Sequence, residues 1–253
     1  MVRVGKEYLP TYDRPRMMNG SWKAAEKLIG RIEEKPRTLA WGWTADRIGY
    51  INVYSLGAAE LPDVFDATLE KLADTWSLIV DLRYNGGGDE PLARRIAGRF
   101  LDRERVYSAS QYRNGPGHGE LTDKLERECE PRGPWRYESP TVVLIGPKTM
   151  SSAESFVFML AVCPQVTTMG DNTAGSSGNP REVDAGAGIS VGLPRWLDLG
   201  PDGKPFDKVG IEPKVRVPAK PEDFGDETDP VLKAALEHLR KAPEAERKPG
   251  KRG

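Results

Sequence analysis

Two runs of apolar residues lack any polar alternation and predict strands that are buried on both faces. They cover residues 77–82 (SLIVDL) and 141–145 (TVVLI), and such runs are typical of parallel sheets. Shorter or alternating patterns predict further strands at residues 39–43, 48–54, 166–169, 189–195, 196–199 and 215–217.

Helical periodicity separates these strands. Apolar residues recur at helical spacing over residues 21–34, 62–75, 91–101, 151–162 and 229–241. Because strands and helices alternate, we expect a single α/β core. Charge, Gly and Pro without periodicity predict an irregular segment over residues 1–20 and a long insertion over 103–139. The chain therefore divides into an irregular and helical lead-in (1–45), a core (46–241) and a disordered tail (242–253).

Composition excludes several classes of function. With 37 Lys and Arg against 38 Asp and Glu, the chain has no basic field, and we expect no nucleic-acid partner. Its two cysteines and two histidines lack ligand spacing, so no metal site is expected. The longest apolar run, residues 156–163, is too short to span a bilayer. The charged N-terminus lacks the apolar segment of a signal peptide.

Three consecutive glycines, Gly86 to Gly88, end the buried strand over residues 77–82. Glycine loses the most conformational entropy on folding, so this position needs a bare backbone. The N–H groups could bind an oxyanion, since ligands of open α/β folds bind at the carboxyl ends of strands. A tight turn between strand and helix is the alternative.

Ser151 begins the helix that follows the strand over residues 141–145. The positive end of a helix dipole and its free N–H groups assist a nucleophile whose attack creates negative charge. Ser151 and Glu154 also fit a capping box, which would explain both residues structurally. Capping is favoured when this motif is taken alone, and the glycine tip shifts the balance towards chemistry.

In these motifs the chain resembles the tail-specific (C-terminal-processing) serine proteases, which are related to the tricorn core protease and to retinoid-binding-protein repeats. D-L-R-x-N-x-G-G at residues 81–88 and S-x-A-E at 151–154 together carry the specificity. Matching segments follow the family's order at residues 48–56, 78–88, 142–155, 169–180, 201–217 and 229–239. The resemblance implies a ClpP-crotonase-like core, a peptide or protein substrate and no cofactor.

The resemblance also assigns roles to residues. Ser151 falls at the position of the nucleophile that forms an acyl-enzyme, and the N–H groups of Gly87 and Ser152 fall at the oxyanion hole. Such donors are each worth about 3–4 kcal/mol in the transition state. Asp81 and Arg83 are expected to support the glycine tip. Substrate strands are expected to dock by β-addition.

The general base departs from the family's pattern. Tail-specific proteases have a lysine in a T-x-G-K-G loop, where this chain has Ser176, and a glutamine near the position of Pro180. A Ser–Lys dyad at this place is therefore excluded. Tricorn-type members use a histidine that precedes the core and a glutamate before the final strand. Glu212 fits the glutamate, but no histidine precedes His118.

Three explanations stay open for the missing base. The first is that the chain is a fragment whose histidine lay upstream. The second is a divergent enzyme that uses either His118 or the pair Ser176 and Ser177 with Glu212, and the third is a peptidase fold without catalysis. A hydroxyl such as that of Ser176 is a poor base without a proton relay. The charged run Glu126–Glu128 is interpreted as solvated surface, and Trp196 as a packed residue rather than the wall of a groove.

The sequence thus predicts a serine peptidase. A non-catalytic module that binds peptides or apolar ligands, and an esterase acting on small activated esters, are the alternatives. Neither the oligomeric state nor the compartment follows from these patterns.

Overall fold

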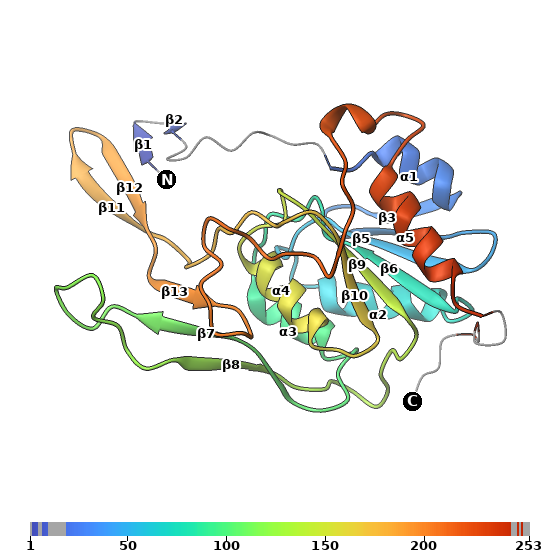
Figure 1. Ribbon diagram of the computed structural model, residues 1–253, viewed down its shortest axis with the longest axis horizontal. Helices are drawn as coiled ribbons and strands as arrows, with labels where there is room; N and C mark the ends of the chain where they lie inside the picture. Colours follow the sequence, from blue (N-terminus) through green and yellow to red (C-terminus); the bar gives the residue numbers. More distant parts are fainter. Residues whose placement is uncertain (1, 5–6, 10–18, 244–246, 248, 250–253) are drawn as a thin grey trace.

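A computed structural model describes residues 2–4, 7–9, 19–243, 247 and 249 of the chain. Its body is a seven-stranded sheet between two layers of helices (Figure 1). The strand order is β14-β10-β9-β6-β5-β4-β3, parallel from β14 to β5 and antiparallel from β5 to β3. The predicted α/β core is confirmed. The strands are β3 (Ile32–Lys35), β4 (Leu39–Trp43), β5 (Ile48–Val53), β6 (Ser77–Asp81), β9 (Thr141–Ile145), β10 (Val166–Gly170) and β14 (Val215–Arg216).

Helices cover both faces of this sheet. The first face carries α2 (Leu61–Lys71), α3 (Glu90–Ala97) and α4 (Ser152–Ala161). The second carries α1 (Trp22–Ile29) and α5 (Pro230–Arg240), preceded by a short 3₁₀ helix at Pro221–Asp223. None of the helices that the structure describes is both long and apolar enough to cross a membrane.

The two helical layers explain why the central strands lack polar alternation. In β6, Leu78 and Val80 pack in the core under α2, α3 and α4, whereas Ile79 packs in the core under α1 and α5. In β9, Val143 and Val142 divide between the two cores in the same way. Successive side chains of a strand point to opposite faces, so both sets must be apolar.

Two smaller antiparallel sheets flank the body. One has the order β13-β7-β8 and contains β7 (Arg105–Tyr112), β8 (Leu125–Cys129) and β13 (Trp196–Leu199). The other has the order β11-β12-β1-β2 and contains β11 (Arg181–Gly186), β12 (Ile189–Leu193), β1 (Val2–Val4) and β2 (Glu7–Leu9).

The expectation of aperiodic segments at 1–20 and 103–139 is therefore wrong where the chain is described. β7 and β8 lie in the supposed insertion, and the register shift between Val106 and Ser108 interrupts the alternation of side chains that would reveal a strand. β1 and β2 are only three residues long, and β1 gains its pairing from β12, far away in the sequence.

The boundary at residue 45 does not separate a lead-in from the core. Gly30 adopts φ 95° and ends α1 after Ile29, so the helix expected to reach residue 34 is shorter. β3 and β4 then follow and belong to the central sheet. The predicted disordered tail lies largely outside the described residues.

Candidate active site

Ser151 lies on a strained turn between β9 and α4. Its backbone adopts φ 58° and ψ −130°, a region that residues other than glycine rarely occupy. Ser151 and Glu154 form the capping box expected at the start of α4. Strained conformations of this kind cluster at active sites, and a sharp strand-to-helix turn is how some hydrolases present a nucleophilic hydroxyl.

Glu154 anchors this turn to a neighbouring loop. Its fully buried carboxylate accepts hydrogen bonds from the N–H of Ser151 (3.1 Å), the hydroxyl of Thr173 (2.5 Å), and the N–H groups of Gly175 (2.6 Å) and Ser176 (2.9 Å). Burial raises the pKa of Glu154, and the four donors oppose that shift. The capping-box interpretation thus holds for the Glu154 carboxylate, whose larger role is to join two loops.

The glycine tip packs directly against the turn. A Cβ atom on Gly87, which has φ 101°, would lie 2.9 Å from the Met150 carbonyl oxygen, 2.9 Å from Ser151 Cβ and 3.0 Å from the Ser152 nitrogen. The Ser152 hydroxyl donates to the Gly88 carbonyl at 2.8 Å. The close approach and the backbone angle both require glycine at position 87.

The two predicted oxyanion donors differ in availability. Ser152 begins α4, so its N–H has no acceptor within the helix. The Gly87 N–H donates to Asn85 Oδ1 at 2.9 Å, and the Asn85 side chain is held by a hydrogen bond to the Val53 carbonyl at 3.0 Å. An oxyanion at this place would compete with Asn85 for the Gly87 donor.

Arg83 supports the glycine tip from beneath. Its fully buried guanidinium binds both Asp81 oxygens, at 2.9 and 2.7 Å, and Asp229 Oδ1 at 2.9 Å. Asp229 also caps α5 by accepting from the Leu232 N–H at 2.9 Å. The end of β6 is therefore fixed to the opposite helical layer, consistent with the support expected of Asp81 and Arg83.

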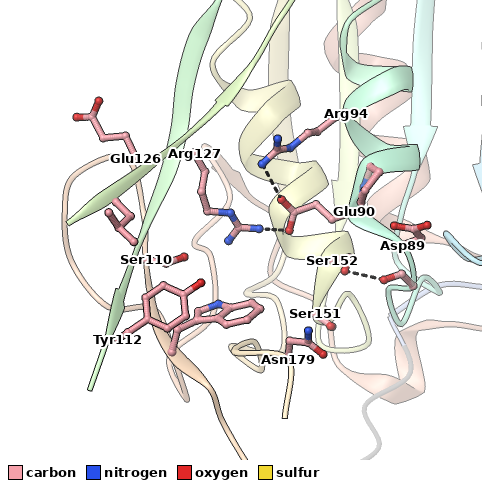
Figure 2. A pocket seen from close by; sticks show the side chains of 14 residues that line it. Asp89, Glu90, Arg94, Ser110, Tyr112, Glu126, Arg127, Ser151, Ser152 and Asn179 are labelled. Atoms are coloured by element: carbon pink, nitrogen blue, oxygen red, sulfur yellow. Dashed lines mark hydrogen bonds and ion pairs between the residues drawn. The ribbon is translucent and has the colours of Figure 1, made fainter. Parts of the chain in front are cut away.

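A cavity of about 540 Å³ opens beside Ser151 and Ser152 (Figure 2). Its other walls come from the start of α3 and from β7, β8 and β13. Tyr112 and Trp196 are cross-strand neighbours in this wall, with ring centroids 5.7 Å apart. Trp196 therefore lines a groove, in addition to packing against a neighbour as expected.

A charged network forms the back of the cavity. Arg94 and Arg127 converge on Glu90 (Figure 2), and Arg127 Nη1 binds Asp198 Oδ1 at 2.9 Å. Asp198 also accepts from the hydroxyl of Ser177. Burial lowers the pKa of Arg127, and Asp198 opposes this shift. The network connects the β7–β8 insertion to the loop that carries Ser176.

Sequence patterns missed this network. The side chain of Arg127 is only 15% exposed, so the assignment of residues 126–128 to a solvated face is wrong at its centre. Glu90, Arg127 and Asp198 come from three distant segments, and no spacing along the chain links them.

The structure brings together only some of the predicted site residues. The Ser176 carbonyl accepts the Ser151 N–H at 2.9 Å, so the loop at the family's lysine position contacts the turn that carries Ser151. His118 is exposed in the segment between β7 and β8. The Glu212 side chain is 76% exposed and pairs with Arg216. Neither His118 nor Glu212 lines the cavity, and the catalytic roles of His118, Glu212 and Ser176 stay predictions.

A strained serine beside a glycine tip and an open cavity defines a site of the hydrolase type. Residues 47–217 match the model of peptidase family S41, and the chain belongs to this family. The resemblance to tail-specific proteases is thereby confirmed.

Individual relatives agree with this family. The chain is 30% identical over 176 residues to the carboxy-terminal processing protease CtpA of Bacillus subtilis (strain 168), which covers 68% of this chain and 35% of CtpA. It therefore spans about a third of that relative's length. A solved Parabacteroides merdae protein assigned to the peptidases has a TM-score of 0.82 and 27% identity over 90% of this chain and 73% of its own. Mature CPAF, at 15% identity, shares the fold with a TM-score of 0.68 over 85% of this chain and 55% of its own.

Proposed function

We propose that this chain is the catalytic core of a serine peptidase. Ser151 Oγ attacks the carbonyl carbon of a peptide bond and gives its proton to a general base. The C–N bond then breaks, the amine leaves with that proton, and water hydrolyses the acyl-enzyme. The strained conformation of Ser151 beside a cavity is the observation that carries this proposal.

The oxyanion would lie between the glycine tip and the start of α4. The Ser152 N–H has no acceptor within the helix and is available to the oxyanion. The Gly87 N–H becomes a second donor once its hydrogen bond to Asn85 Oδ1 breaks. Among the candidate bases, Ser176 lies against the nucleophile turn. Its hydroxyl needs a relay to accept a proton from Ser151 efficiently.

The core is proposed to be of the ClpP-crotonase type, a finer assignment supported by the glycine tip and the serine turn at adjacent strands β6 and β9. The substrate is proposed to be a peptide or protein. This is supported by the similarity to CtpA, a carboxy-terminal processing protease. Strand addition beside the cavity would supply main-chain hydrogen bonds to such a substrate.

A fluorophosphonate probe tests the nucleophile. We expect the wild type to be labelled, Ser151→Ala to lose labelling, and Ser152→Ala to keep it, because alanine retains the backbone N–H. Turnover of peptides and esters then separates the functions. Cleavage of esters alone would indicate an esterase, and a folded wild type that is never labelled would refute the peptidase and favour a binding module.

A further inference from the structure

The sheet of β11, β12, β1 and β2, here called the arm, projects from the body beyond β13 (Figure 1). Two cavity residues flank its central hairpin in the sequence. Asn179 lies two residues before β11, and Trp196 lies three residues after β12. The arm is thus a direct extension of the cavity wall.

The arm is amphipathic. Residues that face each other across antiparallel strands share a face of the sheet. Arg181, opposite Leu193, and Glu7, opposite Val4, lie at the two edges of one face. Between them, Val183 pairs with Val191 and Val4 pairs with Ile189, so these four side chains share that face with Leu193. This set is the apolar face of the arm.

The opposite face is polar. It carries Arg3, Glu182, Asp184 and Ser190. Arg3 forms an ion pair with Glu182 at 3.4 Å and donates to the Ser190 hydroxyl at 3.3 Å. An antiparallel sheet with one polar and one apolar face normally covers its apolar face with a partner.

Within the described part of the chain, this face is only partly covered, with Val183, Ile189 and Val191 half-buried. Leu193 is 50% exposed and Val4 is 45% exposed. None of the five residues of the apolar face belongs to either hydrophobic core or packs against one. Exposed apolar sheet faces of this kind mark interaction sites.

We propose that the apolar face binds an extended, apolar segment of the polypeptide substrate, at a distance from the scissile bond. This inference rests on the proposed peptidase function. From Trp196, at the cavity, the chain runs through Pro194 to Leu193 and on to Ile189. At about 3.3 Å per residue this path is roughly 23 Å long, so an extended substrate reaches the far end of the arm with about seven residues.

The size of the face favours a peptide over a second copy of this chain. A strand of five residues such as β12 is about 17 Å long, and four strands at about 4.8 Å spacing are about 14 Å wide. The face therefore offers roughly 250 Å², whereas a stable dimer buries about 800 Å² on each partner. One strand of substrate needs no more than the face provides.

The test measures peptide binding by the full chain in the Ser151→Ala background, which prevents cleavage. The probes are a fluorescent 14-residue peptide with Val or Leu at alternate positions and lysines at its ends, the same peptide with serine at the apolar positions, and a four-residue apolar peptide. Leu193→Asp and Val191→Asp alter the apolar face. Ser190→Asp is the matched control, because it places the same charge on the polar face next to Val191.

We expect the long apolar peptide to bind about tenfold more weakly to both apolar-face variants and unchanged to the control, because a charge removes an apolar contact. The short peptide should not distinguish the variants. Equal affinity of all variants for the long peptide would overturn the inference. So would a dimer, seen by sedimentation, that Leu193→Asp dissociates and Ser190→Asp does not.

Fluorophosphonate labelling of the same variants, made with Ser151 intact, separates this inference from the proposed function. Labelling at the wild-type rate shows that the site is folded, because the arm lies outside both cores. If all variants bind the long peptide equally and are labelled normally, the role of the arm is refuted and the proposed peptidase function is not. If the apolar-face variants bind the long peptide more weakly but Ser151 is never labelled, the peptidase function is refuted and peptide binding by the arm stands.

Discussion

Substituting Gly87 by alanine should displace the nucleophile turn. The new methyl group would lie 2.9 Å from Ser151 Cβ and 2.9 Å from the Met150 carbonyl oxygen. Atoms at ordinary van der Waals contact are about 3.5 Å or more apart, so the turn or the tip must move by about 0.5 Å. Alanine at φ 101° adds about 1–3 kcal/mol of backbone strain, and the crowding adds about 1–3 kcal/mol.

Gly86→Ala is the matched control, because a Cβ atom at Gly86 would meet nothing within 4 Å. We expect Gly87→Ala to slow fluorophosphonate labelling of Ser151 about 100-fold, since displacements of this order disturb the alignment of a nucleophile. We expect Gly86→Ala to label within about threefold of the wild type. Urea unfolding of both variants shows whether the body stays folded.

Two results would refute this reasoning. Labelling of Gly87→Ala at the rate of Gly86→Ala would show that the close approach of the glycine tip does not position Ser151. Equal slowing in both variants would mean that chain flexibility at the tip matters, and not the space at Gly87.

Three further predictions concern stability and the base. Arg83→Met should lower the free energy of unfolding by about 3–5 kcal/mol by leaving two buried carboxylates unpaired, whereas exposed Arg216→Met should change it by less than about 1 kcal/mol; equal urea midpoints would contradict this. The hydrogen bond from Arg240 lowers the pKa of Asp46 to about 2, so the stabilisation by this pair is complete above the ordinary value of 3.8 and is lost as the pH falls through 2. Asp46→Asn should remove about 1 kcal/mol at pH 7 and only a small fraction of that at pH 2, and a pH-independent difference in unfolding would contradict it. His118→Ala should label at the wild-type rate because His118 is exposed away from the cavity wall, and slowing to the level of Ser151→Ala would identify it as the base.

The sequence alone determined the strands of the core and predicted the turn that carries Ser151. Continuous apolar runs predicted β6 and β9 because helices cover both faces of these strands. Ser151 and Gly87 were proposed as site residues because each follows a buried strand at the same edge of the sheet and falls in a motif of the tail-specific proteases. Such signals lie within a few residues and need no knowledge of distant contacts.

Tertiary structure decided the rest of the site. Glu90, Arg127 and Asp198 meet behind the cavity from α3, β8 and β13. Only the folding of these segments against one another makes an apparently solvated arginine a largely buried one. The arm likewise depends on β1 pairing with β12 across most of the chain. Pairings between distant segments leave no period in the sequence, because each strand's partner lies far along the chain and its own pattern is short, polar or interrupted by a bulge.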